Sequence, residues 1–122
     1  MSIKIHKHDA LTLEVTDAPS AIQIVWTGKS TAREPGAFLG PILGDALREA
    51  RASGRRLTLD FCALDYMNSS TITPVLRMLH EAKGGDAQVT VLYKASLRWQ
   101  QMSFTALTIF GTPDQRVEIR GV

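Results

Sequence analysis

Hydrophobic and polar residues alternate along two early segments of the chain and then follow a helical period. Residues 11–16 alternate apolar and polar side chains, and residues 22–26 form a second short apolar-rich segment, so both are predicted to be strands. Over residues 38–50 the apolar side chains recur at spacings of three and four, which predicts an amphipathic helix that ends at Gly54. Pro41 is expected close to the start of the regular helix, after a bent lead-in.

The second half of the chain continues this alternation of strands and helices. The predicted strands are residues 57–61, 89–93 and 117–119, and the predicted helices are residues 72–82, ending at Gly84 and Gly85, and a less regular one over 97–107. The resulting order is ββαβαβαβ. It predicts an α/β fold with a mixed, mostly parallel central sheet of about five strands, with helices packed on it.

Length and composition fit one packed domain over residues 1–122. Hydrophobic residues make up 44% of the 122 and charged residues 21%, as in ordinary globular proteins. No apolar run approaches the roughly 18 to 20 residues that cross a bilayer, and the N-terminal residues lack a signal-peptide core, so we expect a cytoplasmic protein without membrane contact. A net charge of +2 argues against nucleic acid as a partner. The one basic cluster is assigned to the negative end of the first helix, and its members are Arg48, Arg51, Arg55 and Arg56.

Several weak candidate sites do not reach a functional pattern. Gly28-Lys29-Ser30 ends like a phosphate-binding loop, but Gln23 stands where that loop needs a glycine. His6 and His8 alternate onto one face but offer only two metal ligands. His80 has no Gly-x-Ser-x-Gly partner motif, and the single Cys62 is expected to be a small structural residue. The sequence therefore predicts no catalytic residue, metal or cofactor.

The most informative stretch is residues 65–74, where a strand is followed by four hydroxyl side chains. Pro74 is tolerated only in the first helical turn, so the helix is expected to begin at Ser70 or Thr71, with Ser69 just outside it. One hydroxyl suffices as an N-cap, whereas here Ser69, Ser70, Thr71 and Thr73 crowd together. Capping and phosphorylation both remain open from the residues alone, because a phosphate at this position would meet free amides and the positive end of the helix dipole.

At these residues the chain resembles a known family. Leu59-Asp60-Phe61, Tyr66-Met67, the Asn68-Ser69-Ser70 turn, the following amphipathic helix and the strand at 89–92 are similar to the STAS domain of bacterial anti-sigma factor antagonists. The likeness covers about residues 9–120. In that family the first serine of the pair is phosphorylated by a serine kinase of the histidine-kinase-like ATPase fold, and a metal-dependent serine phosphatase reverses the reaction. The resemblance implies phosphorylation at Ser69, with Ser70 as the alternative.

Two positions depart from the family pattern Met-Asp-Ser-Ser-Gly. Asn68 stands in place of the aspartate and Thr71 in place of the glycine. An Asn followed by Ser/Thr-Ser is similar to a branch of small regulatory phosphoproteins of biofilm and second-messenger control, whose unphosphorylated form binds a diguanylate cyclase. The resemblance thus implies either an anti-sigma factor or a diguanylate cyclase as the partner.

The expected function is a non-enzymatic switch in signal transduction and transcription regulation. The residues expected to contact the partner are Asn68, Ser69, Ser70, Thr71 and Thr73. An unswitched ligand-binding or scaffold domain of the same fold is the alternative, and a serine hydrolase using Ser69 is the third hypothesis.

Overall fold

The structure, a computed structural model, describes residues 1–122. Its strands are β1 (Ser2–His8), β2 (Leu11–Asp17), β3 (Ala21–Ser30), β4 (Arg56–Asp60), β5 (Leu64–Met67), β6 (Gln88–Tyr93) and β7 (Val117–Gly121). Its helices are α1 (Gly36–Ser53), α2 (Ser69–Gly84), α3 (Arg98–Thr105) and the short 3-10 helix η1 (Ala106–Phe110). No helix combines the length and the apolar character that crossing a bilayer requires.

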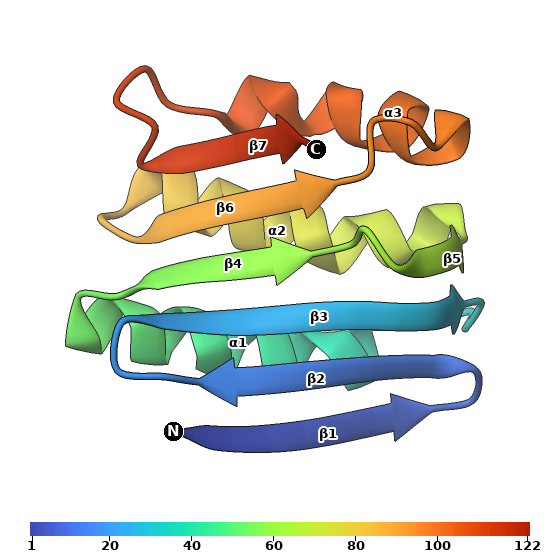
Figure 1. Cartoon of the computed structure of the whole chain (residues 1–122), viewed down its shortest axis with the longest axis horizontal. Helices are drawn as coiled ribbons and strands as arrows, with labels where there is room; N and C mark the ends of the chain where they lie inside the picture. Colours follow the sequence, from blue (N-terminus) through green and yellow to red (C-terminus); the bar gives the residue numbers. More distant parts are fainter.

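The strands form one sheet in which six follow the order β1-β2-β3-β4-β6-β7 and the seventh, β5, pairs with β3 outside this order (Figure 1). β1, β2 and β3 form an antiparallel meander, whereas β3, β4, β6 and β7 are parallel. β3 is long enough to serve two parallel neighbours, because its first half pairs with β4 and its last three residues pair with β5. The predicted α/β class and the mostly parallel sheet are confirmed.

The sheet has seven strands, so the expectation of about five was too low. The two additional strands are β1 and β5. β1 is an edge strand whose side chains are almost all exposed, and β5 has only four residues, of which the middle two are exposed. Neither strand therefore shows the run of apolar residues by which a buried strand is recognised.

The helices lie behind the sheet in the view of Figure 1, and no helix crosses its front face. The core is formed where inward-facing strand residues meet the apolar stripes of the helices. Its largest fully buried side chains include Trp26, Phe61 and Phe104, whose rings contact one another in sequence, with Phe61 between the other two. The apolar stripes predicted for α1 and α2 face this core, which confirms the prediction.

Both long helices begin earlier than the sequence indicated. α1 begins at Gly36 and α2 at Ser69, so Pro41 and Pro74 each stand at the sixth helical residue. A proline there removes one N–H to C=O bond of the second turn, which the helix tolerates next to its already unpaired first turn. The rule that confines proline to the first turn was applied too strictly.

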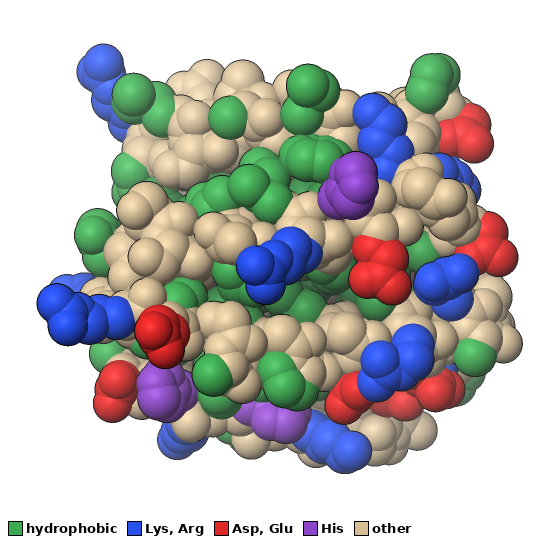
Figure 2. Space-filling view, turned by 180° about the vertical axis from the view of Figure 1, so that it is seen from behind, with side chains coloured by type: hydrophobic (Ala, Val, Ile, Leu, Met, Phe, Trp, Pro, Cys, Tyr) green, Lys and Arg blue, Asp and Glu red, His purple; other side chains and the backbone are tan.

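The four arginines near the end of α1 are held by individual partners. Three of them form ion pairs: Arg48 with Asp45, Arg51 with Asp86, and Arg55 with both Asp17 and Glu49. The fourth, Arg56, donates hydrogen bonds to the Thr90 hydroxyl and to the carbonyl of Gln115. Arg55 and Arg56 lie beyond the helix, after its C-cap Gly54. Figure 2 shows positive and negative side chains interspersed over the helix face of the molecule.

Candidate functional site

The candidate site is the junction at which β5 turns into α2. Asn68 is the N-cap, and Ser69 is the first residue of the helix, not a residue outside it as expected. Because β5 pairs with the end of β3, this junction lies beside the start of the connection from β3 to α1. The site is therefore positioned by the sheet and not by a free loop.

Asn68 uses both ends of its side-chain amide. Its Oδ1 accepts the backbone N–H of Thr71 at 3.1 Å and the hydroxyl of Thr71 at 2.7 Å. Its Nδ2 donates to the carbonyl of Ala32 at 2.9 Å, and its backbone N–H donates to the carbonyl of Ser30 at 2.9 Å. The residue thus caps α2 and ties that cap to the β3–α1 connection.

Thr71 is fully buried, so its side chain does not reach the surface at which a partner was expected to contact it. The Thr71 hydroxyl donates its proton to Asn68 Oδ1, because that amide oxygen can only accept. The Thr71 oxygen therefore accepts the hydrogen bond from the Ser30 hydroxyl, whose oxygen lies 2.6 Å away. The pair of Ser30 and Thr71 links β3 to α2 within the core. Its role is to hold the site in place, which corrects the sequence-based assignment of Thr71.

The remaining hydroxyls of the stretch are accessible to different degrees. Ser69 and Thr73 are exposed, and Ser70 is half-buried. The side chain of Ser69 forms no hydrogen bond within the protein, in contrast to Thr71. The side chain of Ser70 forms no hydrogen bond within the protein either, so Ser69 differs from it only in being the more exposed of the two serines.

The surroundings of Ser69 favour an added negative charge. The first turn of α2 contains no acidic side chain, and the N–H groups of this turn point outward at the positive end of the helix dipole. Next to the turn, Tyr66 in β5 exposes 49% of its surface and is the register partner of Lys29 in β3. The turn that carries Ser69 therefore directly follows a strand with an exposed aromatic residue, and that strand pairs with the lysine-bearing end of β3.

Ser69 and His80 are too far apart to form a catalytic pair. His80 lies on the same helix, eleven residues further on, which corresponds to a separation of about 16 Å along the helix axis. A relay of Ser69 and His80 needs hydrogen-bond distance. His80 therefore cannot serve as the base of a hydrolase that uses Ser69.

Cys62 and the Gly28-Lys29-Ser30 segment also have structural explanations. Burial, and then the neighbouring Asp60 carboxylate, raise the pKa of the Cys62 thiol to about 11, which keeps it protonated at neutral pH. Gly28-Lys29-Ser30 is the end of β3, where the sheet has a register shift and Gly28 adopts φ +86°. A Cβ at Gly28 would lie 1.9 Å from the carbonyl oxygen of Ala10, so glycine is required by packing and not by a phosphate.

The contribution of Ser30 and of the Ala32 carbonyl was not predicted. Ser30 was considered only as part of a phosphate loop, because nothing in the linear sequence connects it with a helix that begins 39 residues later. The parallel pairing of β3 and β5 brings them together. His6 and His8, by contrast, do share one face of a strand as predicted, since they alternate along β1.

Comparisons with known proteins bear on the fold. The sequence matches no protein-family model and no curated protein. Among solved structures, the chain is similar to a protein of the DUF3478 family with a SpoIIAA-like fold from Shewanella loihica, with 18% identity, a TM-score of 0.49, and coverage of 99% of this chain and 84% of that one. It is also similar to an anti-sigma factor antagonist from Mycobacterium paratuberculosis, with 16% identity, a TM-score of 0.63, and coverage of 91% and 94%. The fold expected from the resemblance is thereby confirmed: this chain has the fold of an anti-sigma factor antagonist.

Proposed function

We propose that this protein is a regulatory switch without catalytic activity, which binds another protein through the surface at the start of α2 and is controlled by phosphorylation of Ser69. We call this the Ser69 surface, and it comprises the exposed or half-buried residues Tyr66, Asn68, Ser69, Ser70 and Thr73. The observation that carries the proposal is the sorting of the hydroxyls. Asn68 caps α2 and Thr71 is buried, whereas Ser69 is exposed and its side chain forms no hydrogen bond within the protein.

A phosphate on Ser69 is compatible with the fold. It would stand at the first residue of α2, where negative charge stabilises a helix by a few tenths to about 1 kcal/mol. The buried contacts of Thr71 and Ser30 would not be disturbed, because Ser69 takes no part in them. Phosphorylation is therefore expected to change the surface and not the core.

The effect on a partner follows from charge. The Ser69 surface carries no acidic side chain among its five residues, and a phosphate adds about −1.5 to −2 charges. A partner that covers the uncharged surface would have to desolvate this anion without a group to pair with it, which weakens binding. A partner that offers arginines would respond in the opposite direction.

We propose an anti-sigma factor as the binding partner, on the basis of the fold shared with an anti-sigma factor antagonist. A serine kinase of the histidine-kinase-like ATPase fold and a metal-dependent serine phosphatase would set the phosphorylation state. A diguanylate cyclase is the second candidate partner, because Asn68 makes this turn similar to that of the Asn-bearing branch of regulatory phosphoproteins. Both partners use the same surface, so the first experiment addresses the surface.

The test is phosphorylation by serine kinases encoded near the gene, followed by intact-mass measurement and mapping of the modified residue. Wild type is expected to gain one phosphate, and Ser69→Ala to gain none while unfolding at the same temperature as wild type. Thr73→Ala is the matched control, since it removes another exposed hydroxyl from the same end of α2. Phosphate on the Ser69→Ala variant at the wild-type level would move the acceptor to Ser70 or elsewhere and refute the assignment.

A second measurement separates the switch from its alternatives. In binding assays with the candidate partners, Ser69→Glu is expected to weaken binding more than Ser69→Ala, because the effect is assigned to charge. Equal affinity for both variants, together with unchanged binding of the phosphorylated protein, would favour an unswitched scaffold. A covalent adduct of Ser69 with an activated ester would favour the hydrolase.

A further inference from the structure

An apolar surface lies on the helix side of the molecule, between α2 and the segment formed by α3 and η1. Figure 2 shows apolar side chains gathered there, in the upper half of the view. Met102 of α3 and Ile109 of η1 expose 68% and 72% of their surface, and their apolar neighbours are only partly buried. We call this surface the α2–η1 patch, and its members are Ile72, Leu76, Trp99, Met102, Ile109 and Phe110.

One flank of α2 forms the first side of the patch. Ile72 and Leu76 stand four residues apart beside the buried stripe of the helix, so their side chains are neighbours on its surface. Lys83 lies further along the same flank, seven residues after Leu76, and its Nζ donates to the carbonyl of Ile109 at 2.8 Å. This hydrogen bond shows that the flank faces η1.

The second side of the patch comes from α3 and η1. Trp99 and Met102 are three residues apart on α3, and Phe110 is the last residue of η1. Trp99 and Phe110 pack partly against the core, whereas Met102 and Ile109 project into solvent. The patch therefore combines half-buried apolar side chains with two that are almost fully exposed.

The ionisable side chains that border the patch are basic. Arg98 is the one such residue of α3 and η1 and stands four residues before Met102, and Lys83 contacts the Ile109 carbonyl. Neither side chain takes part in an ion pair. Glu81, the acidic residue of α2, lies on the opposite flank, 4.0 Å from Arg51 of α1.

Acidic residues that follow these helices do not neutralise the patch. Asp86, after α2, pairs with Arg51, and Asp114, after η1, accepts the hydroxyl proton of Thr112. Asp65 of β5 forms no ion pair with Arg98 or Lys83. Each of the two most exposed apolar side chains, Met102 and Ile109, therefore has a basic neighbour that lacks a carboxylate partner.

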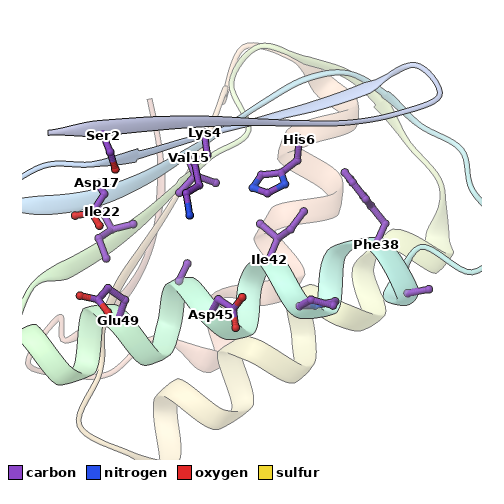
Figure 3. A pocket seen from close by; sticks show the side chains of 13 residues that line it. Ser2, Lys4, His6, Val15, Asp17, Ile22, Phe38, Ile42, Asp45 and Glu49 are labelled. Atoms are coloured by element: carbon purple, nitrogen blue, oxygen red, sulfur yellow. The ribbon is translucent and has the colours of Figure 1, made fainter.

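The cavity between β1 and α1 shows no comparable preference for one sign of charge (Figure 3). It has a volume of about 550 Å³, and three carboxylates line it. Two arginines, Arg48 and Arg55, pair with these carboxylates, and Lys4 of β1 offsets the remaining charge. The α2–η1 patch, in contrast, joins apolar surface to charge of a single sign.

We propose that the α2–η1 patch binds an amphipathic helix of a partner protein, whose apolar stripe covers the patch and whose flanking side chains are acidic. From Ile72 to Lys83, α2 extends over about 16 Å, the length of about three turns of a second helix. An amphipathic helix on an apolar surface, with anchor residues at spacings of three, four and seven, is a recurrent mode of recognition. The patch shares no residue with the Ser69 surface, so the inference goes beyond the proposed switch.

Two other occupants fit the patch less well. A second copy of this chain would bring the same patch to both sides of a two-fold interface, so Arg98 and Lys83 would meet like charges. Anionic lipid surfaces are typically bound by clusters of about four to eight basic residues, whereas two border this patch. An acidic helix supplies the opposite charge with an apolar stripe of matching length.

The test uses two synthetic amphipathic peptides of about 18 residues with the same leucine stripe. The flanking residues are glutamate in one peptide and lysine in the other. Their affinities for the full, unphosphorylated chain are measured by fluorescence anisotropy. The glutamate peptide is expected to bind at least about tenfold more tightly, because its charges complement those at the patch. Equal affinities, or tighter binding of the lysine peptide, would overturn the proposal.

Variants of exposed residues locate the binding without disturbing the core. Met102→Ser and Ile109→Ser are each expected to weaken the glutamate peptide about fivefold and to leave the unfolding temperature unchanged. Ile5→Ser is the matched control, since Ile5 is 60% exposed on β1, at the opposite edge of the sheet from β7. It is expected to leave binding unchanged. Equal weakening by Ile5→Ser would mean unspecific apolar attraction and would overturn the proposal.

A charge variant and a direct map complete the test. Arg98→Gln is expected to weaken the glutamate peptide about threefold, whereas Lys7→Gln on β1 should have no effect. Amide chemical-shift changes on adding this peptide should fall on α2, α3 and η1. Changes confined to another surface would overturn the proposal, as would binding to phosphatidylserine vesicles that depends on Met102 while the peptide does not bind. Because no kinase is involved, failure here would leave the proposed phosphorylation of Ser69 untouched.

Discussion

At the scale of single residues, the hydrogen bonds of Asn68 explain why asparagine suits this site better than the aspartate found in the family that the sequence resembles. Its Oδ1 caps α2, which a carboxylate could also do, but its Nδ2 donates to the carbonyl of Ala32. An aspartate would place an oxygen against that carbonyl oxygen. The departure from the family pattern therefore has a local structural cause.

We expect Asn68→Asp to lower the free energy of unfolding by about 1 kcal/mol. The partly buried carbonyl of Ala32 loses its donor, which costs at most about 1 to 3 kcal/mol, and the favourable interaction of the new charge with the helix dipole offsets part of this cost. Urea unfolding measures the difference, with Asn68→Ala as the reference that loses the cap as well and should cost about 2 kcal/mol. An Asn68→Asp variant more stable than wild type would show that the contact with Ala32 contributes nothing.

The same substitution is also expected to slow phosphorylation. A carboxylate next to Ser69 would place two anions at one end of α2 once the phosphate is added. Initial rates with the cognate kinase, compared between Asn68→Asp and wild type, measure the effect. A faster variant would contradict the resemblance to the Asn-bearing branch.

Cys62 is expected to react slowly with alkylating reagents. Burial, and secondarily Asp60, raise the pKa of its thiol to about 11, so the reactive thiolate forms only as the pH approaches that value. The rate of iodoacetamide labelling should keep rising between pH 8 and 10, where an ordinary thiol with a pKa of about 8.5 levels off. Asp60→Asn should lower the pKa without restoring its ordinary value, because burial is the larger cause. A plateau near pH 9 in wild type would contradict this expectation.

Helical periodicity in the sequence could have distinguished the exposed Ser69 from the buried Thr71, but the two residues were expected to lie on the same surface. Thr71 stands four residues before Val75, and seven before Met78, along the stripe that α2 buries. Helical periodicity therefore directs Thr71 inward. The expectation treated the four hydroxyls as one cluster because it followed the buried stripe of the helix only from Ile72 onward.

At the scale of elements, the hydrogen bond between Ser30 and Thr71 joins the end of β3 to the first turn of α2 at 2.6 Å. We expect Thr71→Val to destabilise the protein by about 1 to 3 kcal/mol, since it leaves the hydroxyl of Ser30 buried without a partner. Ser30→Ala combined with Thr71→Val should cost less than the sum of the single variants. Additive costs in urea unfolding would show that the two hydroxyls act separately.

The elements themselves could largely be predicted, but not their first residues. The apolar stripes of α1 and α2 gave both helices, whereas Pro41 and Pro74 suggested starts that were too late. The sequence contains no sign of which carbonyl can be left unpaired. That depends on exposure of the second turn, which only the tertiary structure determines.

At the scale of the whole molecule, β3, β4 and β6 were predictable because each lies between neighbouring strands and carries buried apolar side chains. β1 and β5 were not, since an edge strand and a four-residue strand do not need apolar side chains to pair. A surface created by an unrecognised strand leaves no pattern in the sequence.

The division of the sheet into an antiparallel meander and a parallel part also has a consequence for how the chain folds. β1, β2 and β3 are joined by tight turns and pair with their immediate neighbours in sequence, whereas each parallel pair must wait for a helical crossover to close. Contacts between neighbouring segments cost less loop entropy, so the meander is expected to form early in the folding transition state.

Kinetics can test this order. Ile24→Val in β3 should mainly slow folding, with a φ-value above about 0.5, and Val117→Ala in β7 should mainly speed unfolding, with a φ-value below about 0.3. Both side chains are fully buried, so each substitution measures how far packing in the core has formed in the transition state. Chevron plots with the two φ-values reversed would place the nucleus in the parallel part. In the expected order, the antiparallel meander assembles before the turn that carries Ser69, because that turn follows the parallel pairing of β5 with β3, so the proposed Ser69 switch forms after the meander.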